Sequence, residues 1–261
     1  MHLNFHFNLA QIFWALTFAA LLVLLVVLLG KDRARRFPVF CSYIVLVTFR
    51  LLASRMLFGR LSPVASAVAF LSLDLVIRLL QVGVVVELAR RAFRGASRKT
   101  WLTGSLVLLA GAGTLVGVWG PWPAWKTLMG NGLEVTLRLM QLVAERCGML
   151  ADALAVELAM VTAFAGRRFH AGWRSHAQKL VVGLSTWGAT LLALRGIWQA
   201  IATHAIPHSQ AEYERIIGLQ EKLYNASSVI YLAVLVWWIA FLWCEEPGIP
   251  AVDSEQPPAA I

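Results

Sequence analysis

An acid, a base and an amide lie on one stripe of an otherwise apolar segment, "SLDLVIRLLQVGVVVELARR" at residues 72–91. Asp74, Arg78 and Gln81 follow one another at steps of four and three, which places them on the same face of a helix. Such groups can pair with one another, bind a charged ligand or pass an ion. Because a charge at the bilayer centre costs at least about 2.5–3.5 kcal/mol, we expect this face to point into a helical bundle.

Other apolar segments carry ionisable residues too, and equal depth within the membrane suggests how they pair. Counting from the outer end of each expected span predicts three pairs: Asp152 with Arg195, Asp74 with Arg50, and Glu157 with Arg78. Two interpretations remain open for these residues and Gln81. In the first they are structural ion pairs that satisfy one another. In the second they line a polar cavity in the outer half of the protein, which binds a ligand or conducts an ion.

The composition predicts the elements that carry these residues. Hydrophobic residues make up 59% of the 261 residues and charged residues 14%, against about 45–50% and about 25% in an average soluble domain. The excess falls into blocks of about 20 residues, the length of a transmembrane helix. We therefore predict an all-α polytopic membrane protein, a bundle of seven transmembrane helices formed by residues 1–245. The expected spans are 9–30, 38–58, 64–89, 101–120, 145–166, 179–201 and 224–244.

The basic residues predict the orientation of the bundle. The first, third and fifth connections carry 13 Lys and Arg, and the second, fourth and sixth carry 4, apart from Arg138 in the stretch 131–143. The positive-inside rule then places the N-terminus outside and the C-terminus in the cytoplasm. The net charge of +9 is distributed in these short clusters rather than in a basic stripe, so we expect a lipid bilayer as partner and no nucleic acid. Residues 246–261 are predicted to form a disordered cytoplasmic tail.

Local signals refine some of the boundaries. Ser62-Pro63 is typical of an N-cap followed by proline at the first helical position, and Pro38 is expected to begin the second span in a similar way. Residues 202–223 are expected to form a polar outer loop. Residues 131–143 either extend the fifth span outward or form a separate outer helix, and 145–166 is the predicted membrane-embedded part.

A short repeat links two of the expected helices. "LDLVIRLLQ" at 73–81 and "LEVTLRLMQ" at 133–141 share the pattern Leu-acid-x-x-x-Arg-Leu-x-Gln. An ancient duplication would produce such a pattern. We favour the simpler interpretation, in which two amphipathic helices use the same side-chain pairing independently.

The sequence contains few signals for catalysis or cofactor binding. Its three cysteines, Cys41, Cys147 and Cys244, have no spacing typical of a metal site or a disulfide framework. No phosphate-binding glycine loop or nucleophile elbow is found. We therefore predict no metal, no cofactor and no catalytic residue, and an enzyme is the least favoured class.

Two segments resemble a known group of proteins. Residues 172–197, which begin the sixth span with Trp173-Arg174-Ser175-His176, and the entry to the seventh span, "KLYNASSVIYLAVLVWW", are similar to a family of uncharacterised bacterial seven-helix membrane proteins. The resemblance implies a multi-pass protein of the bacterial cytoplasmic membrane and brings no activity, substrate or catalytic residue. The chain departs from the family in extra length before the fifth span.

The leading functional hypothesis is a sensor-like or accessory membrane protein. Its outward-facing polar cavity would be lined by the intramembrane charges, and its signal would pass to a cytoplasmic or membrane protein partner through the basic connections. The alternative is a small transporter or an ion or proton pathway that uses the same charges.

Overall fold

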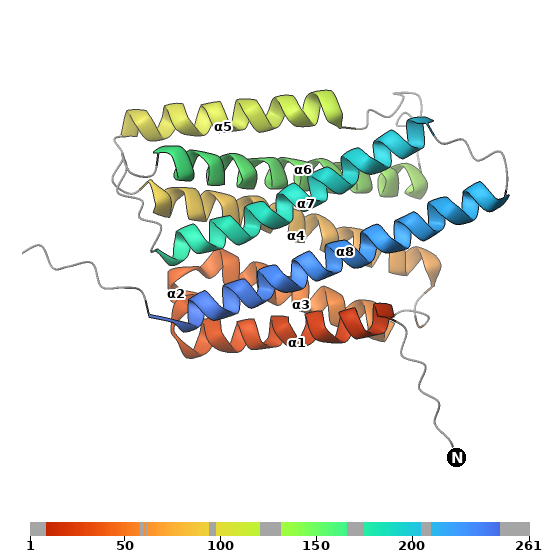
Figure 1. The fold of residues 1–261 in the computed structure, drawn as a ribbon, viewed down its shortest axis with the longest axis horizontal. Helices are drawn as coiled ribbons and strands as arrows, with labels where there is room; N and C mark the ends of the chain where they lie inside the picture. Colours follow the sequence, from red (N-terminus) through yellow and green to blue (C-terminus); the bar gives the residue numbers. More distant parts are fainter. Residues whose placement is uncertain are drawn as a thin grey trace, which may run out of the picture.

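The computed structural model describes residues 9–57, 60, 62–93, 98–120, 132–165, 175–204 and 210–245, and the predicted tail at 246–261 lies outside this set. Within these ranges the chain forms eight α-helices and no β-strand (Figure 1). The helices are α1 (Leu9–Gly30), α2 (Arg33–Arg36), α3 (Pro38–Leu57), α4 (Pro63–Ala92), α5 (Arg98–Trp119), α6 (Leu133–Ala165), α7 (His176–His204) and α8 (Gln210–Trp243).

Seven of these helices, all except the four-residue α2, are long and apolar enough to cross a membrane. The predictions of an all-helical fold and of seven helices able to span a membrane are therefore confirmed for the described residues. The long helices run in alternating directions through one bundle. α1 and α8 both begin at the same end of it (Figure 1). We call this the Leu9 end, and the opposite end, where α1 finishes, the Gly30 end.

Two helices extend well beyond the spans expected from hydropathy. Residues 133–143 continue into the fifth span as one helix, α6, so they do not form a separate outer helix. Residues 210–223, expected to belong to a polar loop, are the first turns of α8. With 33 and 34 residues, α6 and α8 are each about 50 Å long, well over the roughly 30 Å of hydrocarbon in a bilayer.

Helix starts are capped by side chains that satisfy free backbone N–H groups. The Ser62 hydroxyl accepts a hydrogen bond from the Ala65 N–H at 3.3 Å, and Pro63 occupies the first turn of α4, as predicted. α3 begins at Pro38 as expected, but its cap comes from another helix. The Glu87 carboxylate on α4 accepts the Phe40 N–H at 3.0 Å, where the positive end of the helix dipole favours an anion.

The helices form a ring with one helix outside it. α1 packs against α3 and α8, α3 against α4, and α7 against α8, while α6 packs against both α4 and α7. α5 packs mainly against α6 and lies at the edge of the bundle (Figure 1). The ring therefore combines packing between consecutive helices with packing between helices further apart in the sequence, such as α4 with α6 and α1 with α8.

The buried apolar core lies mainly in the Gly30 half of the ring. Trp238 of α8 and Phe40 of α3 are both nearly fully buried and meet edge to face, with ring centroids 5.1 Å apart. Gly183 of α7 has no side chain, which leaves room for the Trp238 indole against its backbone. The tightest packing is thus well separated from the Leu9 end.

The last turn of α8 is capped at the Gly30 end by two basic side chains. The Cys244 carbonyl accepts a hydrogen bond from Arg33 Nη2 at 3.4 Å and lies 3.1 Å from His176 Nε2. A cationic group here also favours the negative end of the helix dipole. Arg33 and His176 thereby connect α2 and α7 to the end of α8.

Candidate functional site

A connected line of polar side chains joins α3, α4 and α6. Arg50 Nη1 lies 2.7 Å from Asp74 Oδ1, and Asp74 Oδ2 lies 3.8 Å from Arg78 Nε. Arg78 Nη1 donates to Gln81 Oε1 at 3.2 Å, and Gln81 Nε2 donates to Asp152 Oδ1 at 2.7 Å. The Asp74–Arg78–Gln81 stripe therefore points into the bundle, and the predicted pair of Asp74 with Arg50 is present.

The line runs from the edge of the bundle to its interior. The Arg50 side chain is 42% exposed and that of Asp74 is 19% exposed, whereas Gln81 and Asp152 are buried. Asp74 Oδ1 accepts no aligned hydrogen bond from the described residues, so its contact with Arg50 is an electrostatic attraction. The inner end at Gln81 and Asp152 is closed and hydrogen-bonded, which is the arrangement expected of a structural pair.

Two glycines permit the close approach of helices around this line. A Cβ at Gly148 of α6 would lie 3.2 to 3.5 Å from the Arg78 side chain, so the absence of one lets Arg78 lie along α6. A Cβ at Gly188 of α7 would lie 2.9 Å from the Asp152 carbonyl oxygen and 3.1 Å from its Cα. α6 and α7 therefore touch backbone to backbone at Asp152.

This contact fixes the register of α6 and α7, in which Asp152 and Arg195 attract each other electrostatically but form no direct ion pair. Asp152 of α6 lies level with Gly188 of α7. Seven residues along each helix toward the Leu9 end, about two turns, Glu145 of α6 lies level with Arg195 of α7. The expected depth of Asp152 is counted from residue 145, the start of the predicted span. α6 begins further out, at Leu133, so that count does not start from the outer end of the helix. Asp152 bonds to Gln81 instead.

The predicted pair of Glu157 with Arg78 is also absent. Glu157 lies between α6 and the peripheral α5, where a Cβ at Gly111 would lie 2.5 Å from its Oε1. Its Oε2 is buried and accepts no hydrogen bond from the described residues. Glu157 therefore faces α5, and Arg78 is occupied by Asp74 and Gln81 on α4.

A cavity of about 1140 Å³ opens in the Leu9 half of the bundle, separate from the polar line. Arg195 lines it, while the other predicted site residues, Arg50, Asp74, Arg78, Gln81, Asp152 and Glu157, do not. Of the seven residues predicted to line a single polar cavity, Arg195 lines this one, five form the polar line, and Glu157 faces α5. Its wall is formed by Trp119, Glu145, Trp187, Leu191, Leu194, Arg195, Trp198, Gln199, Ile217, Gln220, Glu221, Leu223, Tyr224 and Ser227.

Two helices contribute most of this wall, each through one face. On α7 the lining residues recur from Trp187 to Trp198 at steps of three and four, and on α8 from Ile217 to Ser227 at the same steps. The Trp119 ring at the end of α5 adds a side wall, because it lies against Gly196, where a Cβ would be 2.9 Å away. The wall is mainly apolar and aromatic, with a few polar groups.

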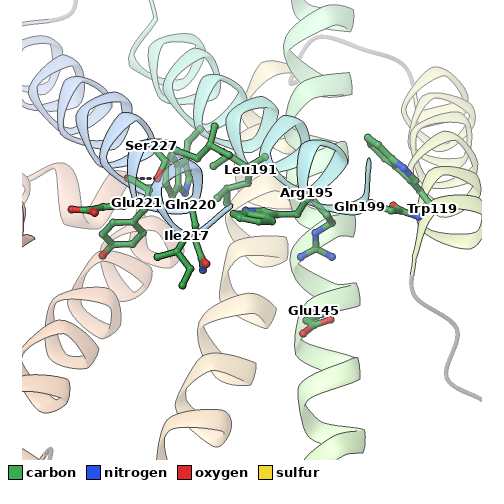
Figure 2. Close-up of a pocket in the computed structure, with 14 residues that line it drawn as sticks. Trp119, Glu145, Leu191, Arg195, Gln199, Ile217, Gln220, Glu221 and Ser227 are labelled. Carbon is green, nitrogen blue, oxygen red and sulfur yellow. Dashed lines mark hydrogen bonds between the residues drawn. The ribbon is translucent and has the colours of Figure 1, made fainter. Parts of the chain in front are cut away.

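Opposite charges face each other across the cavity. Figure 2 shows the Arg195 guanidinium on α7 and the Glu145 carboxylate on α6 pointing toward the same space. Glu145 Oε1 accepts a hydrogen bond from Gln141 at 3.0 Å. Arg195 makes no hydrogen bond or ion pair with the residues that the structure describes. Asp152 attracts this guanidinium electrostatically without a direct contact, so its N–H donors stay available and make it a candidate anion-binding group.

Several cavity residues were missed by reasoning from the sequence. In the sequence, Trp187, Trp198 and Tyr224 resemble ordinary apolar and interfacial positions, because none of them carries a charge. The available signal was the face of α7 on which Trp187, Leu191, Arg195 and Trp198 recur at helical spacing. That pattern alone does not show which helix lies opposite.

The comparisons with family models, curated proteins and solved structures find no match to this chain. The chemistry of the site therefore has to be derived from its own side chains. Among the described residues these provide a concave aromatic surface, one cation that makes no direct ion pair and two acids, Glu145 and Glu221.

Proposed function

We propose that this protein is a receptor-like membrane protein, sensor-like or accessory, which binds a small amphipathic molecule in the cavity between α6, α7 and α8. The observation that carries the proposal is Arg195, a cation with no ion-pair partner among the described residues, in an aromatic-lined cavity of about 1140 Å³. Ligand sites are typically concave, mainly apolar and of about 300–1,000 Å³, with a few polar groups that orient the ligand. The cavity has this composition and slightly more than this volume.

The orientation that we propose places the cavity outside the cell. The excess of Lys and Arg in the first, third and fifth connections, 13 against 4, favours an outer N-terminus and a cytoplasmic C-terminus. The Leu9 end, and the cavity with it, then faces outward. The resemblance of residues 172–197 to bacterial seven-helix proteins supports a location in the bacterial cytoplasmic membrane.

An output route follows from the same orientation. The basic connections at the Gly30 end would face the cytoplasm, where a cytoplasmic or membrane protein partner can contact them. α7 and α8 both line the cavity and also meet near Cys244 through His176. A ligand that changes the spacing of α7 and α8 would therefore alter the surface offered to that partner.

Filling the cavity tests the proposed binding. Native mass spectrometry of the full chain, purified from its own membrane, should show retained small-molecule adducts. Leu194→Trp places an indole in the cavity and should remove them, whereas Leu139→Trp, on the exposed outer part of α6, should leave them in place. Equal adducts in Leu194→Trp and in the unaltered protein would overturn the proposal.

A transport pathway is the second candidate, and the polar line from Arg50 to Asp152 favours it. Intramembrane charges that alternate in sign are a common feature of ion and proton routes. Proteoliposomes with an internal pH-sensitive dye would then show proton flux that Asp152→Asn abolishes and Glu134→Gln does not. No flux above that of empty vesicles would eliminate this candidate, in agreement with the burial of Gln81 and Asp152.

A further inference from the structure

The charges of the cavity wall restrict what it can bind. One base, Arg195, and two acids, Glu145 and Glu221, line it, and they come from three different helices. A simple anion would be drawn to Arg195 but repelled by the acids, and a simple cation would meet the reverse. A molecule with both charges satisfies Arg195 and an acid at once, and Glu145 is the acid that points toward the same space (Figure 2).

The cavity also has a surface for an apolar group. Trp187, Leu191 and Leu194 line it along α7, and Trp119 and Tyr224 add aromatic rings from α5 and α8. Tryptophan and tyrosine favour the level at which lipid headgroups meet acyl chains, because their rings are apolar with one polar group. A ligand with a charged head and an apolar body fits this wall better than a wholly polar one.

The position of the cavity agrees with a lipid. Arg195 lies about two turns from the Gly188–Asp152 contact in the middle of the bundle, near the outer limit of the apolar part of α7, which ends at Ile201. On the α8 side, Tyr224 is 62% exposed and Ile217 45% exposed, so this wall is open at the bundle surface. An acyl chain can enter there from the membrane.

We propose that the cavity holds the headgroup of a zwitterionic phospholipid, with the phosphate on Arg195 and the ammonium group toward Glu145. Guanidinium suits phosphate because its parallel N–H groups donate to two oxygens at once. The Glu145 carboxylate has an oxygen left to accept from the ammonium group, since Gln141 occupies only Oε1. This inference rests on the proposed function and adds the class of ligand to it.

The experiment compares two lipids in the purified full chain. The protein is mixed with equal amounts of dioleoyl phosphatidylethanolamine and dioleoyl phosphatidylglycerol in detergent, and bound lipid is counted by native mass spectrometry. The ethanolamine lipid should be retained in preference. Arg195→Gln should reduce binding of both lipids about tenfold, because a charge-assisted hydrogen bond contributes about 1.5–3 kcal/mol. Glu145→Gln should mainly remove the preference between them.

A matched control comes from the outer part of α6. Glu134 and Arg138 form an exposed ion pair of 2.6 Å on the same helix and do not line the cavity. Glu134→Gln and Arg138→Gln should therefore change neither the amount of lipid bound nor the preference. A variant that unfolds is recognised by its circular dichroism spectrum, and Arg195→Lys then replaces Arg195→Gln, since lysine keeps the charge but loses the paired donors.

Two results would overturn the inference. The first is equal retention of the two lipids by the unaltered protein, or no loss in the Arg195 variants. The second is complete displacement of the ethanolamine lipid by millimolar phosphoethanolamine, which would identify a water-soluble zwitterion as the occupant. If either occurs while Leu194→Trp still removes adducts, the proposed function stands and only the lipid assignment fails.

Discussion

Gln81 of α4 donates a 2.7 Å hydrogen bond to Asp152 of α6, and both side chains are buried. Gln81 also accepts from Arg78, so its amide group connects a cation to a buried carboxylate. An amide can do this because one end donates and the other accepts. α4 and α6 have the most extensive mutual packing of any two helices described, and this hydrogen bond adds a polar contact inside it.

Removal of that amide should be strongly destabilising. Gln81→Leu leaves the Asp152 carboxylate buried without its donor, which should lower the free energy of unfolding by about 3 kcal/mol. The double variant Gln81→Leu/Asp152→Leu should recover part of the loss. Unfolding in sodium dodecyl sulfate, followed by circular dichroism, measures both. The control is Gln141→Leu on the exposed part of α6, with an expected effect within about 0.5 kcal/mol.

The acids of the two repeat segments, Asp74 and Glu134, form ion pairs that should contribute unequally to stability. A double-mutant cycle with Arg50→Gln and Asp74→Asn should give a coupling energy of about 1 kcal/mol or more, because Asp74 lies inside the bundle. The same cycle on Glu134 and Arg138, which are both well exposed, should give about 0.3–0.5 kcal/mol. Equal coupling in the two cycles would mean that burial does not distinguish these pairs.

Small substitutions should test the backbone-to-backbone contact between α6 and α7. Gly188→Ala places a methyl group 2.9 Å from the Asp152 carbonyl oxygen, so the backbones must separate, at a cost of about 1–3 kcal/mol. Gly113→Ala on α5 meets nothing within 4 Å and should leave stability unchanged or slightly raised. Thermal unfolding in detergent compares the two variants. A neutral Gly188→Ala would contradict the proposed register of α6 and α7.

The number of spans and some helix starts could be predicted from the sequence, because hydropathy and caps are local properties. Ser62 and Pro63 begin α4 as expected for such residues. The ends of α6 and α8 could not be found in this way, since their outer turns are amphipathic and resemble a polar loop by hydropathy alone. Tertiary contacts and continuous helical hydrogen bonding determine those ends.

Pairing between helices was predictable only where the counted depth was right. Asp74 and Arg50 meet because α3 and α4 are adjacent and their connection is short. Asp152 and Arg195 attract each other but form no direct ion pair, because the helix register places them about two turns apart. The cavity depends on how α7 and α8 face each other across space, and a pattern within one helix does not contain that relationship.

Membrane topology is open to a direct measurement. A fusion of alkaline phosphatase after Ile261 should be inactive in a bacterial host, and a fluorescent protein at the same place should be active, because the loop charge bias of 13 against 4 predicts a cytoplasmic C-terminus. Fusions after Leu57, between α3 and α4, should give the reverse result and serve as the control. Phosphatase activity at Ile261 would place the cavity on the cytoplasmic side.

The packing of α8 against α1 determines when the protein can become complete during synthesis. α8, the neighbour of α1 in the ring, follows the other described helices in the chain and leaves the ribosome after them, and the core residue Trp238 belongs to it. Until α8 enters the membrane, Phe40 lacks its edge-to-face neighbour, and Arg33 and His176 have no Cys244 carbonyl to bind. The earlier helices therefore form an incomplete ring in the bilayer, and insertion of α8 between α1 and α7 completes that ring.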